Sequence, residues 1–208
     1  AKSHREIPHY RLEERIDLRP CMGWLAETNR ARPVKEQLLP VVLLIKATAL
    51  ALRKVPDLNA WWVNGGLQRK PEVHLGFVIS LRTGGILVPA IHHADRLTLD
   101  ELMRHLGMLI PRARALKLRS SELAEGTATL TSLGDRGASV VHGLIYPPQV
   151  ALVGFGGITE QPWAENGTID ARPVVTASLA ADHRATDGAT GSRFLRTMAE
   201  LLQHPGEL

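Results

Sequence analysis

The sequence predicts an α+β fold in which helices flank a mixed β-sheet. Several short apolar segments bounded by Gly, Pro and Asn have the length and the flanking residues of strands. Longer segments carry the apolar periodicity of helices, including one that closes the chain. Because the two kinds of segment do not alternate regularly, a mixed sheet is favoured over a parallel sheet built from βαβ units.

Length and composition indicate an ordinary globular chain. With 208 residues, no internal repeat and no long linker, residues 1–208 are predicted to form a single domain. A hydrophobic content of 44% excludes an intrinsically disordered protein. The lack of a long uncharged apolar run excludes a membrane-spanning helix and predicts no membrane partner. The first residues lack a signal-peptide pattern, and we expect the chain to be a piece of a longer protein.

Charge and cysteine content narrow the class of partner. Of the 25 basic residues 19 are arginine, whose guanidinium suits phosphate and carboxylate groups. There is no Lys/Arg block and no alternation of basic with aromatic residues, so no nucleic acid partner is predicted. The single cysteine, Cys21, cannot form an internal disulfide or a two-cysteine metal site, which favours a reducing compartment.

The first elements follow from local patterns. From Tyr10 to Arg19 apolar and charged residues alternate, which predicts a half-buried strand interrupted at Glu14. Residues 38–55 are apolar on nearly all sides and carry Pro40 where a helix start tolerates it. We therefore expect a helix there that lies in a core or at a subunit interface.

The middle of the chain predicts a hairpin and a helix. Residues 73–81 and 86–91 have the pattern of two strands joined by a Gly-rich turn. Thr98 and Glu101 have the spacing of a capping box at the start of a helix. Pro111 is expected to kink that helix or to end its first half.

The second half predicts three further strands and a closing helix. The strands cover residues 127–132, 149–156 and 173–182. The helix begins after Asp187 and buries an apolar stripe that ends before Pro205.

The segment DHRATDG, at 182–188, is the first candidate site because it joins an apolar strand to an amphipathic helix. His183 could act as a general base, since an ordinary imidazole pKa of about 6.5 suits proton removal near neutral pH. The alternative is structural: His183 caps the following helix, and Asp187 is its N-cap.

Other polar clusters have competing explanations as well. A hydroxyl on the predicted strand at 127–132 could donate to an oxyanion, although Thr is also common in strands for its β-propensity. His92 and His93 are adjacent, and on a strand they would point to opposite faces, so one shared metal ion is not expected. The glycines at 154–157 lack the spacing of a phosphate loop and indicate a strand end and a turn.

Six segments taken together resemble a known family. In chain order they are IPHY, VPDLNAWW, GGILVPAI, ATLTSLGDRG, YPPQVALVGFG and ADHRATDG. They resemble the catalytic domain of dihydrolipoamide acyltransferases, the core components of 2-oxo acid dehydrogenase complexes, from about Ile7 to Pro205. The resemblance implies a chloramphenicol-acetyltransferase-like fold of CoA-dependent acyltransferases. It also implies a homotrimer that packs into a larger core, with the active site between two subunits.

The resemblance assigns roles to individual residues. His183 matches the family's catalytic histidine, Thr131 the hydroxyl that stabilises the tetrahedral intermediate, and Asp187 a motif aspartate that acts structurally through an arginine. Substrate or CoA contacts are expected at Ser132, Gly134, His92 and Arg184. Threonine at the hydroxyl position is similar to succinyl-transferring members, whereas the residues after it are more similar to acetyl and branched-chain members. The acyl group therefore stays open.

The implied reaction moves an acyl group between the thiol of dihydrolipoamide and the thiol of coenzyme A, without a metal. The 208 residues contain neither a lipoyl domain nor a peripheral-subunit-binding domain, so lipoamide is expected on a separate lipoyl domain. The implied partners are that lipoyl domain, a 2-oxo acid decarboxylase-dehydrogenase and dihydrolipoamide dehydrogenase. The implied location is the cytoplasm, or the mitochondrial matrix in a eukaryote.

Two alternatives remain beside this hypothesis. A stand-alone chloramphenicol-type acetyltransferase shares the His–Asp-Gly motif, and a structural core subunit would assemble without transferring anything. The DHR form and the PPQVALVGFG segment favour the complex-forming enzymes over the first alternative. His183, Asp187 and the hydroxyl at Thr131 favour activity over the second.

Overall fold

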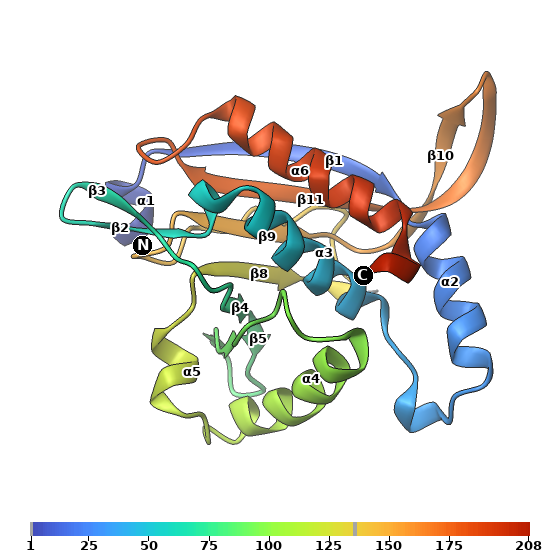
Figure 1. The fold of residues 1–208 in the computed structure, drawn as a ribbon, viewed down its shortest axis with the longest axis horizontal. Coiled ribbons are helices and arrows are strands. Elements are labelled where there is room, and N and C mark those ends of the chain that lie inside the picture. The colour runs from blue at the N-terminus through green and yellow to red at the C-terminus, as the bar shows by residue number, and fades with distance from the viewer. Residues whose placement is uncertain (1, 135–136) are drawn as a thin grey trace.

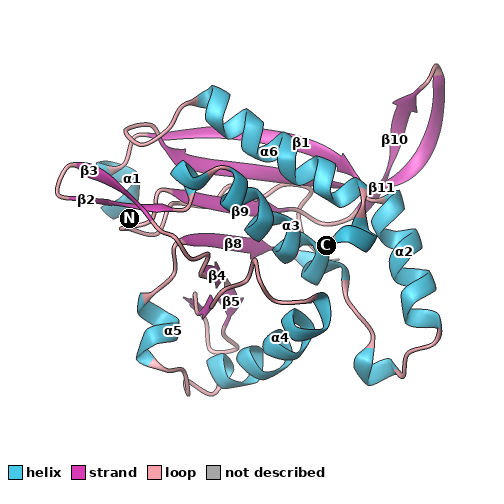
Figure 2. Ribbon diagram, in the orientation of Figure 1, coloured by secondary structure: helices cyan, strands magenta, loops and turns pink. Residues whose placement is uncertain are grey.

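The computed structural model describes residues 2–134 and 137–208. Within these residues one mixed sheet has the strand order β1-β11-β9-β8-β4-β7, and β10 pairs with the outer half of β11 (Figures 1 and 2). Two short hairpins, β2-β3 and β5-β6, lie outside this sheet. The strands are β1 His9–Asp17, β2 Ala60–Val63, β3 Gly66–Arg69, β4 Leu75–Phe77, β5 Ile79–Ser80, β6 Ile86–Leu87, β7 Ala90–Ile91, β8 Ala128–Ser132, β9 Ala151–Phe155, β10 Thr159–Glu165 and β11 Thr168–Asp182.

Helices cover one face and one end of this sheet. In Figure 1, α3 and α6 cross in front of the sheet, while α4 and α5 lie below it. The helices are α1 Lys2–Glu6, α2 Arg19–Arg30, α3 Pro40–Lys54, α4 Leu99–Arg114, α5 Ser120–Ala124 and α6 Gly188–Gln203, with 3-10 turns at Val34–Glu36, Pro56–Leu58 and Pro205–Glu207. In the part of the chain described, no helix is long and apolar enough to cross a membrane. The mixed sheet with its helices confirms the predicted α+β class.

Strand β11 organises the sheet. It runs antiparallel to both β1 and β9, while β9 runs parallel to β8 and β8 runs parallel to β4. Every residue of β11 from Val174 to Asp182 is buried, because α6 and α2 pack against this half of the strand. Its outer half forms a two-stranded arm with β10 that projects from the body of the molecule (Figure 1). The strand therefore ends, at Asp182, on a rigid part of the core.

Helix α3 forms the centre of the hydrophobic core. All its residues from Val42 to Ala49 are buried, and α2, α4 and α6 pack against it. Of the two locations predicted for this apolar helix, the structure shows the core. Lys46 is the one charged residue in this buried run. Its ammonium donates hydrogen bonds to the carbonyl oxygens of Asp95 (2.8 Å) and Leu97 (2.6 Å). The buried charge thus attaches α3 to the loop that precedes α4.

Patterns in the sequence located most elements, and one expectation was wrong. Strand β1 is continuous through Glu14, which pairs with Ala177, because the ladder with β11 holds the backbone where the apolar alternation fails. Helix α4 begins at the predicted capping box and continues past Pro111 to Arg114, so the proline does not end the helix there, and the expected kink stays a prediction. The predicted hairpin before α4 is confirmed by its antiparallel pairing.

The predicted hairpin from residue 73 to residue 91 is divided between two sheets. Strands β4 and β7 belong to the main sheet, whereas β5 and β6 pair only with each other beyond it. The antiparallel register is the same on both sides of the break, and the Val78 N–H donates to the Leu130 carbonyl oxygen of β8, which lies on the other side of β4.

Two hairpins and α2 were not predicted. The turns Asn64-Gly65 and Asn166-Gly167 have positive φ at both residues, the conformation that two-residue hairpin turns require. This Asn-Gly signal is present in the sequence and would have located β2-β3 and β10-β11. Helix α2 starts at Arg19 with a proline in its first turn and no side-chain cap. Its start therefore has no capping signal in the sequence.

Replacing Lys46 by Met should destabilise the fold. The variant keeps the side-chain volume but leaves two buried carbonyl oxygens without a donor, which costs about 2 kcal/mol of unfolding free energy. Urea denaturation followed by circular dichroism measures this loss. Lys54→Met, at the exposed end of the same helix, is the matched control and should stay within about 0.5 kcal/mol. Equal unfolding midpoints for the two variants would contradict the role of Lys46.

Candidate active site

His183 lies in the turn that follows β11. Its backbone N–H donates to the carbonyl oxygen of Pro8 at 2.9 Å, and its side chain is exposed in the single chain. The imidazole ring makes an edge-to-face contact with the ring of Tyr10, with centroids 5.1 Å apart. The backbone is thus fixed by the sheet, while the ring is presented at the surface where a substrate can reach it.

The acidic residues of the DHRATDG segment have separate tasks. Asp187 is the N-cap of α6 and accepts a hydrogen bond from the Thr190 N–H at 2.8 Å, which lowers the pKa of its carboxyl. The structural alternative is therefore right for Asp187. In this chain Arg184 pairs with Asp182, and the expectation that Asp187 acts structurally through an arginine stays a prediction.

The arginine of the motif, Arg184, is held by Asp182. The Asp182 carboxylate is fully buried and accepts bonds from the Arg184 guanidinium at 2.6 Å and 2.9 Å, which raises the pKa of the guanidinium. The guanidinium also lies 5.0 Å from the ring of Trp62. Two groups thus hold Arg184 beside His183, and it does not present a free positive charge to a phosphate.

Thr131 and its neighbours lie at the end of β8. Thr131 is half-buried and pairs in register with Gly154 of β9. The predicted contact residues Ser132 and Gly134 line a small hollow of about 160 Å³, whose other walls are apolar. Thr131 is not among the residues that line this hollow, and the expected substrate contacts of Ser132 and Gly134 stay a prediction.

Within one chain, His183 and Thr131 lie at opposite ends of the sheet. Thr131 pairs with Gly154, and Gly154 pairs with Ser178 of β11. His183 follows Ser178 by five positions, which corresponds to roughly 17 Å along the strand. Figure 1 shows the arrowheads of β8 and β11 at opposite ends of the sheet. A single chain therefore does not bring this imidazole and this hydroxyl to one carbonyl group.

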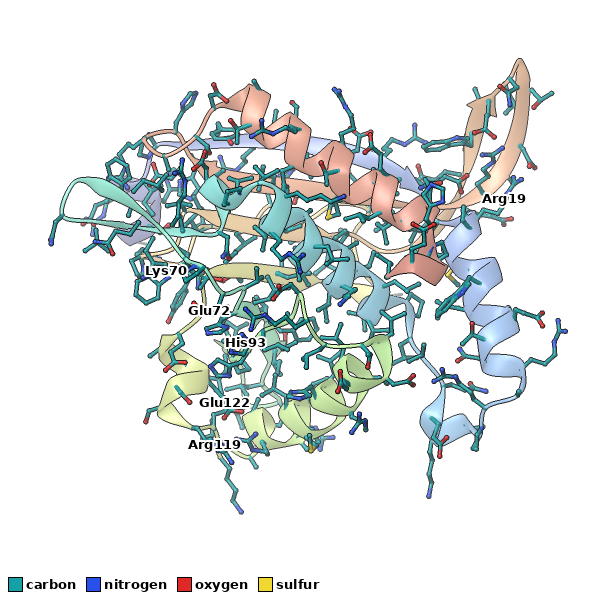
Figure 3. The ribbon with its side chains drawn as sticks, viewed as in Figure 1. Arg19, Lys70, Glu72, His93, Arg119 and Glu122 are labelled. Carbon is teal, nitrogen blue, oxygen red and sulfur yellow. The ribbon has the colours of Figure 1, made fainter. Side chains whose placement is uncertain are left out.

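His92 is part of a separate cluster of imidazoles. It follows β7 in a turn, where its Nε2 lies 2.9 Å from the Glu125 carboxylate, and its ring contacts that of His74. The His93 N–H donates to Nδ1 of His74 at 3.1 Å. His93 has a φ of 51°, so these histidines are not on a strand and do not point to opposite faces as expected. Figure 3 labels His93 in the part of the molecule formed by α4 and α5.

One possible ligand atom from each of His74, His92 and Glu125 lies within 4.8 Å of the others, which is a spacing that could suit a cation. Burial, and then the neighbouring imidazoles, lower the pKa of His74 and keep it neutral near pH 7. Nδ1 of His74 and Nε2 of His92 already have protein partners, and hydrogen bonding explains this arrangement. The predicted lack of a metal stays a prediction.

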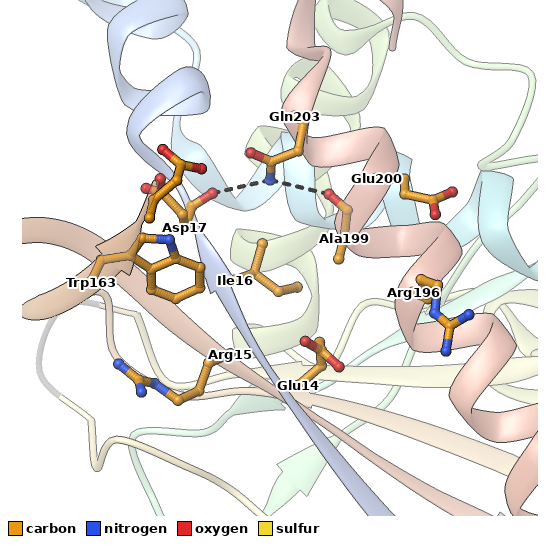
Figure 4. Close-up of a pocket in the computed structure, with 10 residues that line it drawn as sticks. Glu14, Arg15, Ile16, Asp17, Trp163, Arg196, Ala199, Glu200 and Gln203 are labelled. Atoms are coloured by element: carbon orange, nitrogen blue, oxygen red, sulfur yellow. Dashed lines mark hydrogen bonds between the residues drawn. The ribbon is translucent and has the colours of Figure 1, made fainter. Parts of the chain in front are cut away.

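Two other features lie apart from the candidate residues. A pocket of about 290 Å³ is lined by residues of β1, α6 and the β10 arm (Figure 4). At this pocket the Gln203 amide donates to the carbonyl oxygens of Asp17 and Ala199. Cys21 is buried in α2, and burial raises the pKa of its thiol to about 12. A thiol of this kind is not a nucleophile near neutral pH.

Comparison with known sequences identifies the family. The profile described as 2-oxoacid dehydrogenases acyltransferase (catalytic domain) matches residues 1–208. The chain belongs to this family. Two relatives of this acyltransferase domain are components of dehydrogenase complexes. The lipoamide acyltransferase component of the branched-chain alpha-keto acid dehydrogenase complex from Pseudomonas aeruginosa is 34% identical and is matched over 98% of this chain and 48% of its own. The dihydrolipoyllysine-residue acetyltransferase component of the pyruvate dehydrogenase complex from Staphylococcus epidermidis is 33% identical. It is matched over 99% of this chain and 48% of its own length.

The acyltransferase domain thus spans about half the length of the curated relatives it matches.

Solved structures agree with the family. A probable dihydrolipoamide acetyltransferase from Listeria monocytogenes superposes with a TM-score of 0.92 at 26% identity, over 98% of this chain and 87% of that one. The Azotobacter vinelandii dihydrolipoamide acetyltransferase superposes with a TM-score of 0.91 at 29% sequence identity. The match covers 97% of this chain and 84% of that one. The structure of a cubic core of the pyruvate dehydrogenase multienzyme complex has the same TM-score, sequence identity and coverage. A chloramphenicol acetyltransferase superposes with a TM-score of 0.66 at 13% sequence identity, over 95% of this chain and 91% of that one. This likeness confirms the predicted fold.

Some side chains near the candidate residues were not predicted. The ring of Tyr10 contacts that of His183, and Asp182 and Trp62 contact Arg184, the next residue along the chain. The alternation of β1 placed Tyr10 on the apolar side of its strand. Which residue it faces depends on the register with β11, and no local sequence signal contains that information.

The thiol of Cys21 should be unreactive in the folded protein. With a pKa of about 12, only a minute fraction of this thiol is ionised at pH 8, and the side chain is buried. Titration with a disulfide reagent at pH 8 is expected to show no reaction without denaturant. In urea the same sample should react with one equivalent per chain. Rapid reaction of the folded protein would show that the α2 end of the core opens.

Proposed function

We propose that this acyltransferase domain transfers an acyl group between dihydrolipoamide and coenzyme A, within a 2-oxo acid dehydrogenase complex. The observation that carries the proposal is the exposed side chain of His183 in the turn directly after the buried end of β11, in a chain of this family. The exposed imidazole is available to a thiol. The hydroxyl partner, Thr131, ends another strand of the same sheet.

Spacing along the chain supports the choice of residues. In the Azotobacter vinelandii enzyme, a serine, a histidine 52 residues later and an asparagine four residues after that were studied for their role in the catalytic mechanism. Thr131, His183 and Asp187 have the same two spacings. Ser132 lies one residue too close to His183 to fit this pattern, so the spacing favours Thr131 as the hydroxyl.

The chemistry follows from the groups themselves. A free thiol has a pKa of about 8.5 and is mostly protonated near pH 7. The neutral imidazole of His183 takes the S–H proton of CoA, and the thiolate attacks the thioester carbonyl of acyl-dihydrolipoamide. A new C–S bond forms, and the Thr131 hydroxyl donates to the oxyanion. Collapse breaks the old C–S bond, and the leaving thiolate takes the proton back from the imidazolium. Charge and protons balance, and no redox step occurs.

The distance between His183 and Thr131 implies that two chains build one site. If His183 of one chain meets Thr131 of the next, a closed ring of chains repeats the same contact at every interface. The relatives are components of large complexes, and one similar structure is a cubic core. We therefore propose a homotrimer that packs into a larger core, with the lipoyl domain and the dehydrogenase components as its partners.

Transfer from acyl-CoA to dihydrolipoamide should require His183. His183→Ala is expected to abolish measurable transfer and to leave assembly unchanged, because the side chain is exposed. Thr131→Val should lower kcat about a hundredfold, the usual loss for one oxyanion donor. The assay uses acetyl-, succinyl- and isobutyryl-CoA, and the donor with the highest kcat/KM identifies the acyl group. His105→Ala, an exposed histidine of α4, is the control. Near-normal transfer by His183→Ala would exclude this mechanism.

Two inactive variants should restore each other if the site joins two chains. In trimers formed by co-expressing His183→Ala and Thr131→Val in equal amounts, about a quarter of the interfaces pair an intact histidine with an intact threonine. Activity is therefore expected to rise to about a quarter of the wild-type value. A site within one chain predicts only the mean of the two variants. Light scattering checks that all samples have the same size, and no recovery would contradict the two-chain site.

A further inference from the structure

The segment before β1 and the first residues of that strand form one wall around His183. Tyr10 pairs with Ala181 in the β1–β11 ladder, two residues before His183. Its ring meets the imidazole edge to face, with an angle of 64° between the ring planes. In the described part of the chain, Tyr10 is the one aromatic residue in ring contact with His183. The Pro8 carbonyl holds the His183 N–H, so one short segment contacts both the backbone and the ring of this histidine.

The position of Tyr10 is itself fixed on the far side of the same turn. Its hydroxyl lies 2.9 Å from the Thr186 hydroxyl, and the Thr186 N–H donates to the carbonyl oxygen of Asp182. Tyr10 therefore contacts the turn from residue 182 to residue 186 at two points, once through its ring and once through its hydroxyl. Burial raises the pKa of the phenol, which keeps the hydroxyl protonated and able to share a proton with Thr186.

Helix α6 leaves room for this ring at a single glycine. A Cβ added at Gly191 would lie 2.8 Å from Cδ1 of Leu12, 2.9 Å from Cε2 of Tyr10 and 3.0 Å from the Tyr10 hydroxyl oxygen. Real Cβ contacts below 3.0 Å are essentially never seen, so a larger residue at 191 would crowd both the Tyr10 ring and the Leu12 side chain. Gly191, Thr186 and the β1–β11 ladder thus define one position for the ring that borders His183.

We infer that Tyr10 is a positioning residue that restricts the orientation of the His183 imidazole through its ring. This inference rests on the proposed function. A general base is effective only when its nitrogen is held within hydrogen-bond reach of the proton, and displacement by about 1 Å can cost a large factor in rate. An exposed imidazole with no neighbouring ring would sample several rotamers. The Tyr10 ring excludes part of that range.

The test compares Tyr10→Leu with Tyr10→Phe in the transfer assay. Tyr10→Leu removes the ring, and we expect kcat to fall about tenfold while KM for CoA and for dihydrolipoamide changes less than about twofold. Tyr10→Phe keeps the ring and should retain at least about a third of the wild-type kcat. The control is Tyr146→Leu, the same substitution at the only other tyrosine, which is exposed and has no described contact with His183.

The outcomes separate the inference from the proposed function. A wild-type kcat in Tyr10→Leu, an equal loss in Tyr10→Phe, or a loss confined to KM would overturn the positioning role. If Tyr10→Leu does not assemble, Tyr10→Met replaces it, because it removes the ring but keeps a long apolar side chain, and an unchanged kcat there overturns the inference. Retained transfer in His183→Ala would overturn the proposed function itself. If His183→Ala loses transfer activity while Tyr10→Leu keeps a normal kcat, only the positioning role is overturned.

Discussion

Strand β11 imposes the constraint on which the site depends. It is buried from Val174 to Asp182, and its neighbours on both sides run antiparallel to it. Because β8 runs parallel to β9, the carboxyl ends of β8 and β11 must lie at opposite ends of the sheet. His183 and Thr131 are therefore kept apart by the hydrogen-bond ladder itself. No rotamer change or loop movement of one chain can bring them together, and a site that uses both requires a second chain.

The turn after β11 shows how a rigid scaffold can hold an exposed side chain, here the histidine proposed as the general base. The Asp182 carboxylate, fully buried, holds Arg184, and the Pro8 carbonyl holds the backbone of His183. Asp187 then starts α6 with an N-cap bond to Thr190. Each polar group of the motif except the imidazole is thus engaged in local structure. Within the described residues the imidazole lies at the surface, and its ring contact is with Tyr10, an arrangement that the proposed role as a base requires.

Charge pairs also explain why the arginine-rich composition does not identify a CoA site. Arg184 is paired with Asp182, and His92 lies against Glu125, so both of these predicted contact residues have an acidic neighbour. Arg112 is likewise held by Glu122, whose carboxyl pKa this contact lowers. The count of basic residues in a sequence does not show which of them are neutralised. That depends on carboxylates that approach from other segments.

By itself, the sequence determined the fold class, most strands and helices, and the candidate residues for the site. These depend on local information: apolar periodicity, the Thr98–Glu101 capping box, and a motif in which His183 and Asp187 are four positions apart. Only the tertiary structure decided that the hairpin before α4 is divided between two sheets, that Tyr10 faces His183, and that Thr131 lies at the far end of the sheet. The physical reason is that strand order and register arise from hydrogen bonds between segments far apart in the chain, and the residues of one segment do not specify which partner they meet.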